Sequence, residues 1–512
     1  MRALATFLFC AFVLPLYAKT SAVLDSSVTR ITVKGVDKMS VTEFRRWEIR
    51  DKDGYRYCVF NDYENAFRKV KSLRYTIYDA NGNRVKRFGL GDAMDVQFNA
   101  PYEVTDSRML YLDPDYRGFP FSVEIETVVV CDQFLDFPDW MPRYSYNMEV
   151  KFATLELECP SGYRFRCKSF NGKIDSTTVQ RSGERTYVWT LRNLEATGPY
   201  LHESSFGKDQ PRVSISPFEF SMGGVKGSYS SWAEFGDWYL ALNKEQSPLS
   251  EKTKQDLRGI RQKSADEREL IRNVYKYMQQ KTRYVSIQLG IGGFKALPVE
   301  KVDRNGYGDC KALSQYMHVL LTEVGVSSNY VLAKAGSDAS DVVADFPSNQ
   351  FNHIFVAVPL AADTTWLECT SQITPASYLG RFTDDRNVLW IAPGKSGIIR
   401  TPCFTAPESV CKSASVVRLD PEGNAVMTVS RRQGGFYFDE MAAYNSMSAS
   451  QQERFNSSKF SYPDFVIGSF KYSVLGADRL LALDFGLKVN SLARRAGDRL
   501  LLPLNIFQPV DG

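Results

Sequence analysis

The spacing of hydrophobic and polar residues indicates strands in the first part of the chain. Polar and apolar residues alternate there in runs rich in β-branched and aromatic side chains, a pattern typical of half-buried strands. Turn-forming residues separate the runs at 79–83 and 160–162. The runs are Arg30–Val33, Tyr55–Phe60, Leu73–Tyr78, Phe121–Val130 and Tyr187–Leu191. We therefore predict an N-terminal antiparallel β-sandwich domain over residues 27–225.

The pattern changes to a helical period at about residue 230 and returns to short strands at about residue 396. Apolar residues recur at helical spacing in Trp232–Leu242 and Leu270–Met278, and Ser264–Glu267 forms a capping box between them. We predict an α+β multidomain protein, with a central α+β domain over 229–395 and a C-terminal β domain over 396–512. The sequence stops without a terminal element, so we expect this last domain to be incomplete.

The first 22 residues have the features of a secretory signal peptide. Arg2 supplies positive charge, residues 3–16 form an apolar run too short to span a bilayer with its flanks, and Ala18 or Ala22 offers a small residue for cleavage. No later stretch reaches the ~18 apolar residues of a membrane span. We expect an exported protein of the periplasm, extracellular space or cell envelope, without a stable membrane span.

The composition excludes several classes of protein. Of the 512 residues, 44% are hydrophobic, which opposes disorder, and a net charge of +4 leaves no basic excess for binding nucleic acid. Three histidines, no CxxC pair and no calcium-loop pattern argue against a metal site, and we expect no cofactor. The sequence leaves open the oligomeric state and whether Cys403 pairs with Cys411.

Residues 305–313 (NGYGDCKAL) carry the strongest signal for chemistry. Two glycines and an aspartate predict a tight turn, and apolar residues then recur at helical spacing as far as Val324. Cys310 is therefore expected at a helix start, where the macrodipole and free backbone N–H groups favour the nucleophilic thiolate. The alternative is a small buried hydrophobic residue, because free cysteines are usually buried.

A thiol nucleophile needs a base, and the chain offers three histidines. His318 lies about 12 Å along the same helix from Cys310, which is too far to take its proton. His202 lies outside the helical region. We therefore expect the base to be His353, near the start of a strand over 351–358 whose successive side chains point to opposite faces.

A third group should orient the base. Residues 365–369 form a second short strand after a turn, and we expect it to pair with 351–358 as an antiparallel hairpin. Glu368, opposite or diagonal to His353, would then accept the Nδ1 proton and hold the productive tautomer. Cys369 would point to the other face of the strand as inert core.

Four sequence segments resemble the core of the transglutaminase-like superfamily, which shares the Cys-His-acid catalytic arrangement of papain. They are YVSIQLGIGGF (284–294), YGDCKAL (307–313), FNHI (351–354) and WLECTSQ (366–372). The closer resemblance, over about residues 30–510 and most securely 265–385, is to an exported bacterial group with an N-terminal β domain of unknown function. It implies a transglutaminase-like, papain-like central domain. Carried over by position, Cys310 is the nucleophile, His353 the base and Glu368 the orienting acid, although the superfamily usually has aspartate there.

Acyl transfer also needs donors for the oxyanion. The backbone N–H of Cys310 is one candidate, and the side chain of Gln288 is a second, although a loop glutamine bonded to the backbone explains Gln288 equally well. Gly290 and its neighbours 292–293 would let a substrate chain approach, but they lack the features of a phosphate loop. Lys311 could stabilise the thiolate, and we expect it to be exposed.

Two functions from different classes fit these residues. The first is cysteine-dependent acyl transfer on a peptide or protein amide through a thioester, either hydrolytic (peptidase or amidase) or transglutaminase-like. The second is a catalytically silent envelope protein that binds or assembles through its β domains. A carbohydrate-acting protein is a weaker third hypothesis, because no spaced pair of carboxylates can be assigned to it.

Overall fold

The computed structural model describes residues 20–503, except for some short segments. These are 98–102, 182, 199–206, 245–246, 337–338, 440–443, 445–446, 449, 453, 456–463 and 476–479. The predicted signal peptide, 1–22, therefore lies outside the described residues except for its last three. None of the helices within the described part of the chain is both long and apolar enough to cross a membrane.

The chain divides into two compact units. The first comprises Met1–Leu242, Ile287–Gly293 and Asp345–Asn349, and the second comprises Asn243–Ser286, Phe294–Ala344 and Gln350–Gly512. The candidate residues Cys310, His353 and Glu368 belong to the second unit, whereas Gln288 belongs to the first. The three predicted domains 27–225, 229–395 and 396–512 stay predictions.

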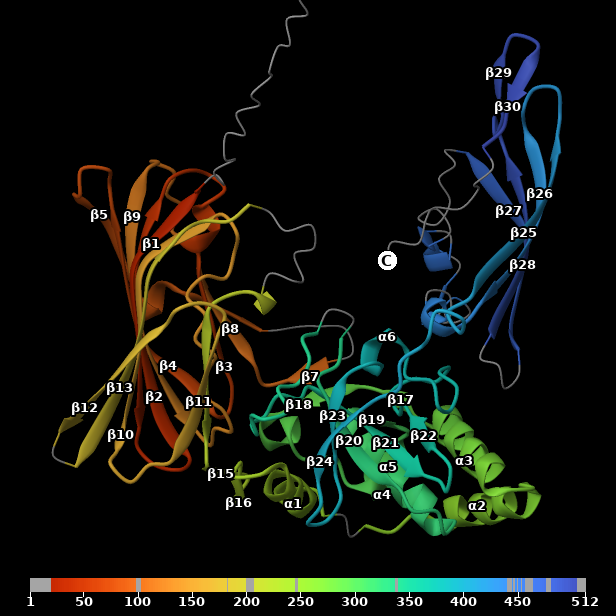
Figure 1. The fold of residues 1–512 in the computed structure, drawn as a ribbon, viewed down its shortest axis with the longest axis horizontal. Coiled ribbons are helices and arrows are strands. Elements are labelled where there is room, and N and C mark those ends of the chain that lie inside the picture. The colour runs from red at the N-terminus through yellow and green to blue at the C-terminus, as the bar shows by residue number, and fades with distance from the viewer. Residues whose placement is uncertain are drawn as a thin grey trace, which may run out of the picture. The chain divides into compact units, whose positions relative to one another are not determined.

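An eight-stranded sheet with the order β12-β13-β10-β1-β2-β9-β4-β5 is the main element of the first unit (Figure 1). Its strands are β1 (Ala22–Val33), β2 (Lys38–Ile49), β4 (Arg68–Tyr78), β5 (Arg84–Gly89), β9 (Phe121–Asp132), β10 (Met148–Pro160), β12 (Asp175–Arg181) and β13 (Glu184–Leu194). Neighbouring strands are antiparallel except β1 and β10, which are parallel.

Smaller sheets complete this unit. They are β3-β8-β6, β11-β14, β15-β16 and β18-β7. Their strands are β3 (Phe60–Glu64), β6 (Met94–Gln97), β7 (Glu103–Thr105), β8 (Arg108–Leu112), β11 (Phe165–Phe170), β14 (Arg212–Pro217), β15 (Glu219–Met222), β16 (Val225–Ser228) and β18 (Ser286–Gln288). The helix α1 (Trp232–Leu242) follows β16 and confirms the helical spacing predicted for these residues.

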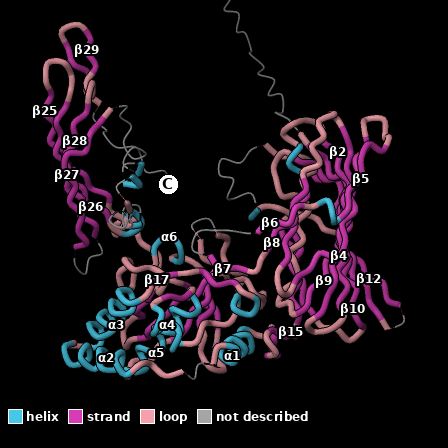
Figure 2. Tube along the Cα trace, turned by 180° about the vertical axis from the view of Figure 1, so that it is seen from behind, coloured by secondary structure: helices cyan, strands magenta, loops and turns pink. Residues whose placement is uncertain are grey.

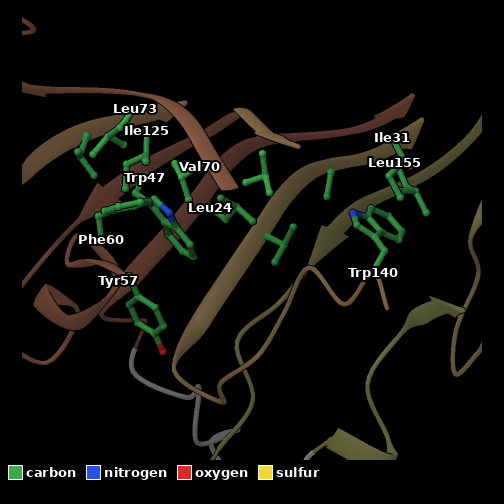
Figure 3. Close-up of a cluster of buried hydrophobic side chains, with 14 of the residues drawn as sticks. Leu24, Ile31, Trp47, Tyr57, Phe60, Val70, Leu73, Ile125, Trp140 and Leu155 are labelled. Carbon is green, nitrogen blue, oxygen red and sulfur yellow. The ribbon is translucent and has the colours of Figure 1, made fainter. Parts of the chain in front are cut away.

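The core of the first unit follows from alternation along its strands. Every second side chain of β9 is buried, as the pattern over 121–130 predicts. Figure 3 shows part of this core, in which the Trp47 ring stacks on Tyr57 with centroids 5.2 Å apart. The predicted turn at 79–83 is also confirmed, because the Asp79 carboxylate accepts hydrogen bonds from the backbone N–H groups of Asn81 and Asn83, both at 2.9 Å.

The second unit contains a five-stranded antiparallel sheet with the order β22-β21-β20-β23-β24. Its strands are β20 (Asn329–Ala333), β21 (His353–Pro359), β22 (Thr364–Leu367), β23 (Asn387–Trp390) and β24 (Gly397–Arg400). The helices are α2 (Glu251–Lys263), α3 (Glu267–Lys281), α4 (Val299–Asn305), α5 (Cys310–Glu323) and α6 (Gly380–Thr383), and the two-residue strands β17 (Arg283–Tyr284) and β19 (Tyr307–Gly308) pair beside them.

The strand β21 has a hydrophobic cluster on each face. Val356 and Val358 pack with the apolar side chains of α3 and α5, and Phe355 and Ala357 belong to a separate cluster with Trp366. This strand is therefore covered on both sides, which explains why the stretch is almost continuously apolar.

A buried carboxylate joins four helices of this unit. Asp303 of α4 accepts hydrogen bonds from Tyr316 of α5 at 2.6 Å and Thr253 of α2 at 2.7 Å, and it pairs with Lys281 of α3. Burial raises the pKa of Asp303, but the contacts with Lys281, Ser250, Tyr316 and Thr253 outweigh burial and lower it. The group therefore stays ionised at neutral pH and holds the helices in register.

The N-cap of α3 lies two residues after the predicted cap, Ser264. Asp266, not Ser264, caps α3, and its carboxylate accepts a hydrogen bond from the backbone N–H of Glu269 at 2.8 Å. The Ser264 hydroxyl instead donates to the carbonyl of Ile260 at 2.9 Å, at the end of α2. The predicted apolar stripe from Leu270 to Met278 is buried and therefore confirmed.

The last strands form a four-stranded antiparallel sheet with the order β25-β26-β28-β27. They are β25 (Cys411–Leu419), β26 (Ala425–Gln433), β27 (Phe465–Leu475) and β28 (Leu480–Val489), followed by the hairpin of β29 (Arg494–Ala496) and β30 (Arg499–Leu501). The return to short strands that the sequence predicts after about residue 396 is confirmed by these elements.

The predicted fold class, an α+β multidomain protein with a transglutaminase-like α+β centre, is wrong. The protein is mostly β, with 44% of residues in strands and 19% in helices, and it is built from many small sheets. Figure 2 shows the helices α2, α3, α4 and α5 grouped together within the second unit. The predicted N-terminal antiparallel sandwich also differs, because β1 and β10 pair in parallel. Local periodicity marks each helix or strand, but pairing between distant segments decides the class of the whole chain.

Candidate active site

The position of Cys310 at the first turn of a helix is confirmed. Asp309 is the N-cap of α5, and its carboxylate accepts a hydrogen bond from the backbone N–H of Ala312 at 2.9 Å. Gly308 is needed in the turn, because a Cβ atom there would lie 2.9 Å from the Cβ of Ala312. Cys310 is 9% exposed, so the thiol is nearly buried at a helix end that favours an anion.

Lys311 is buried, contrary to the expected exposure. It is 7% exposed, and its ammonium pairs with the carboxylate of Asp309, which is 2% exposed. The ion pair explains the difference, because a lysine can leave water when a carboxylate beside it compensates its charge. The same Asp309 therefore caps the helix and neutralises the residue that follows the nucleophile.

His353 and Glu368 form a buried pair, as the predicted hairpin requires. His353 begins β21, and Glu368 directly follows β22. The Nε2 atom of His353 lies 2.9 Å from Oε2 and 3.1 Å from Oε1 of Glu368. The pairing of Val356 with Leu367, continued along the hairpin, puts Glu368 diagonal to His353.

The ring nitrogen that contacts Glu368 is Nε2, not the predicted Nδ1. Because Nε2 donates to the carboxylate, Nδ1 is the nitrogen left for Cys310. The prediction was wrong because the ring orientation depends on where the helix end meets the strand, which the sequence pattern does not contain.

The electrostatics of the pair favour a charged imidazolium. Burial lowers the pKa of His353, but the charge of Glu368 and hydrogen bonds with Cys310 and Glu368 outweigh burial and raise it to about 10. Burial raises the pKa of Glu368, but His353 and Thr370 outweigh it and lower this pKa. The interaction with Cys310 that raises this pKa indicates that the side chains of the predicted nucleophile and base lie beside each other.

Several contacts that support Glu368 were not predicted. Thr370 donates from Oγ1 to Oε1 of Glu368 at 2.6 Å and from its backbone N–H to the same atom at 3.2 Å. Tyr275 of α3 donates to the Glu368 carbonyl at 2.7 Å. A threonine two residues after a carboxylate is a local signal that could have found the first contact. The contact of Tyr275 joins segments 93 residues apart and has no such signal.

The other predicted roles have mixed outcomes. His318 bonds Ser328 at 2.8 Å between Nδ1 and Oγ, and burial lowers its pKa, in agreement with a packed residue. Cys369 is 1% exposed and burial raises its pKa, which confirms an inert core thiol.

His202 lies outside the described residues. Gln288 is half-buried in β18 of the first unit, and its role as an oxyanion donor stays a prediction.

The cysteines of the described residues are all free. Cys403 and Cys411 are both exposed and unpaired with each other. Cys403 therefore provides an exposed reference thiol for the reactivity of Cys310, whereas the sulfur of Cys411 accepts a hydrogen bond from Arg431 at 3.1 Å.

Comparison with known proteins adds a family match and a similar fold. Residues 39–197 match the family model of DUF3857, a domain of unknown function with a solved structure. Comparison with curated proteins finds no match to this sequence. The resemblance of the central motifs to the transglutaminase-like superfamily stays a prediction.

A crystal structure from Parabacteroides distasonis, named "putative protease", is similar over 92% of this chain and 94% of that chain, with a TM-score of 0.54 and 12% identity. At this identity the likeness shows the fold alone. Two M1 zinc metallopeptidase structures from Deinococcus radiodurans have TM-scores of 0.21 and 0.22 and identities of 11% and 12%. They cover 41% and 61% of this chain and 46% and 65% of theirs, and carry no argument.

Proposed function

We propose that the protein catalyses cysteine-dependent acyl transfer on an amide or peptide bond, with hydrolysis as the overall reaction. The observation that carries this proposal is that His353 is bonded to the buried Glu368 at 2.9 Å while its side chain also interacts with that of Cys310 at the start of α5. A nucleophile, a base and an orienting acid in contact are the groups that this chemistry requires.

The proposed reaction starts from the thiolate of Cys310 beside the imidazolium of His353. The sulfur attacks the carbonyl carbon, a C–S bond forms, and the carbonyl electron pair moves to oxygen. As the C–N bond breaks, His353 gives its Nδ1 proton to the leaving amine and a thioester remains. Water then transfers a proton to His353 and attacks the thioester, and cleavage of the C–S bond restores the thiolate.

Other groups would hold the charges during this reaction. The backbone N–H of Cys310, at the first turn of α5, is a candidate donor to the oxyanion. Glu368 stays ionised and keeps Nε2 protonated, so that Nδ1 is free to exchange its proton. If an amine replaced water in the second half of the reaction, the same groups would carry out transamidation.

The substrate proposed for this site is a peptide or protein amide of the cell envelope. The features of residues 1–22 support export. The protein of similar fold from Parabacteroides distasonis is named "putative protease", which is consistent with peptide-bond chemistry on this fold.

Thiol labelling tests the proposal, with Cys403 as an internal reference. Cys310 is nearly buried and Cys403 is exposed, so accessibility alone would make Cys310 the slower thiol. We expect iodoacetamide near neutral pH to modify Cys310 faster than Cys403, and His353→Ala to remove this difference. Labelling of Cys310 no faster than Cys403 would overturn the proposal and favour the envelope binding protein.

Trapping of the thioester intermediate on Cys310 would identify the acyl group of the substrate. Incubation of the protein with an envelope extract, followed by acid quenching and peptide mass spectrometry, should show an adduct on Cys310. The Cys310→Ala variant is the control, because it can form no thioester at this position.

A further inference from the structure

Few large hydrophobic side chains are exposed between α2 and β24. Among the described residues of the second unit in this range, they are Tyr284 (36%), Ile373 (43%), Phe382 (46%) and Ile399 (36%). The first three lie on segments that adjoin the proposed catalytic residues, as the following contacts show. Ile399 lies on β24, the edge strand of the five-stranded sheet.

Phe382 packs directly on the proposed base. Its ring meets the ring of His353 edge to face, with centroids 5.0 Å apart and planes at 69°. Because 46% of Phe382 is exposed, the ring covers one side of the imidazole and presents its remaining surface to solvent.

The backbone that carries Phe382 is held on both sides. The carbonyl of Phe382 accepts a hydrogen bond from the N–H of Gly336 at 2.9 Å. Arg386 donates to the carbonyls of Arg381 and Gly336, both at 3.0 Å, and Thr401 donates to that of Thr383 at 3.0 Å. The backbone that positions the Phe382 ring is therefore held by hydrogen bonds to neighbouring segments.

Tyr284 lies on β17, beside the segment of Cys310, and Ile373 lies on the segment that follows Glu368. Tyr284 pairs with Gly308 between β17 and β19, two residues before Cys310. Gln372, next to Ile373, donates to the carbonyl of Thr282 at 3.3 Å, which brings the segment after Glu368 beside the start of β17. Tyr284 and Ile373 therefore lie on segments beside those of the proposed nucleophile and acid, and Phe382 lies against the ring of the proposed base.

We propose that Phe382 is a specificity-determining residue that contacts an apolar or aromatic side chain of the acyl donor beside the scissile amide. This inference rests on the proposed function. A rigid, half-exposed aromatic ring against a reacting group gains stabilisation when a ligand covers it, because apolar surface then leaves water. Polar or charged side chains at the same place would gain nothing from this contact.

Two alkylating probes with the same leaving group test the inference. Iodoacetamide carries no side chain, whereas N-benzyliodoacetamide carries an aromatic ring beside its amide. The measured quantity is the ratio of the Cys310 labelling rate with the benzyl probe to that with iodoacetamide. The ratio cancels any effect of a substitution on the intrinsic reactivity of the thiol.

The expected ratio in the wild type is well above one, and we expect Phe382→Ser to reduce it about five- to tenfold. Phe382→Leu keeps an apolar side chain and should lose less of the ratio than Phe382→Ser. Ile399→Ala is the matched control, since it removes another exposed apolar side chain (36% against 46% for Phe382) from the edge strand, and it should leave the ratio unchanged.

The outcomes separate this inference from the proposed function. If iodoacetamide labels Cys310 no faster than Cys403 in the wild type, the proposed function fails. If Cys310 is labelled fast but the ratio is the same in the wild type, Phe382→Leu and Phe382→Ser, the enzyme proposal stands and the role of Phe382 is overturned.

Discussion

Nε2 of His353 lies 2.9 Å from Oε2 of Glu368, and both side chains are 7% exposed. His353 begins β21 and Glu368 directly follows β22, so the two residues lie at one end of a single hairpin and are only 15 residues apart in sequence. Their burial is expensive for separate charges, so each is stable there only because the other compensates it. The pair gives a protonated ring, held in one orientation, at the end of β21.

Replacement of Glu368 tests the third member of the proposed triad. Glu368→Gln keeps the shape but removes the charge that holds the imidazolium. We expect the rate of acyl transfer to fall roughly 10²- to 10⁴-fold, whereas Cys310→Ala abolishes turnover and leaves folding nearly intact. Steady-state kinetics on a peptide substrate and circular dichroism measure the two effects. Full activity in Glu368→Gln would show that the acid is wrongly assigned.

Thr370 is predicted to position Glu368. Thr370→Val removes the hydroxyl that donates at 2.6 Å, while Thr370→Ser keeps it. Loss of a hydrogen bond to a charged group costs about 1.5–3 kcal/mol, so we expect labelling of Cys310 to slow about tenfold or more in the valine variant. Because this bond lowers the pKa of Glu368, the acidic limb of the pH–rate profile should shift to higher pH. Equal profiles for the valine and serine variants would contradict this role.

The stability of the protein should depend on His353 at alkaline pH. The pKa of His353 is raised to about 10, above the ~6.5 of an unfolded chain. The charged pair therefore contributes its full stabilisation below about pH 6.5 and loses it as the pH rises through about 10. Urea unfolding from pH 7 to 10 should show a steeper loss of unfolding free energy in the wild type than in His353→Gln. Parallel curves would exclude the raised pKa.

The helices of the second unit should depend on Asp303. Asp303→Ala leaves Lys281 without its buried partner and removes the acceptor of Tyr316 and Thr253. We expect a loss of about 3–5 kcal/mol in the free energy of unfolding. Lys252→Ala, which breaks an exposed pair with Asp256, should cost less than about 1 kcal/mol and serves as the control. Chemical denaturation followed by fluorescence compares the two, and equal losses would refute the central role of Asp303.

Local patterns predicted the elements around the site well. Alternation over 121–130 corresponds to β9, the apolar stripe of 270–278 corresponds to the buried face of α3, and Cys310 begins α5. Each of these features depends on neighbours within a few residues, where period and capping chemistry act directly. The cap of α3 was misplaced because both Ser264 and Asp266 can cap, and the hydroxyl of Ser264 is used at the end of α2.

The errors concern contacts between segments. The predicted fold class gave too much weight to helix. The helical periodicity is easy to recognise in the sequence, but the helices contain only 19% of the residues, against 44% in strands. Burial of Lys311 depends on Asp309 turning its second carboxylate oxygen toward the ammonium while the first caps the helix. The supporting contact of Tyr275 with the Glu368 carbonyl joins α3 to the end of β22 and leaves no trace in either local pattern.

The sequence by itself determined that a cysteine would start a helix and that a histidine and a glutamate would share a hairpin. Helix starts and strand alternation follow from the chemistry of adjacent residues. Only the tertiary structure decided that Nε2 faces Glu368, that Thr370 and Tyr275 support it, and that Phe382 covers the ring of His353. Those contacts depend on how separate segments pack and turn against each other, and packing is a property of the folded chain as a whole.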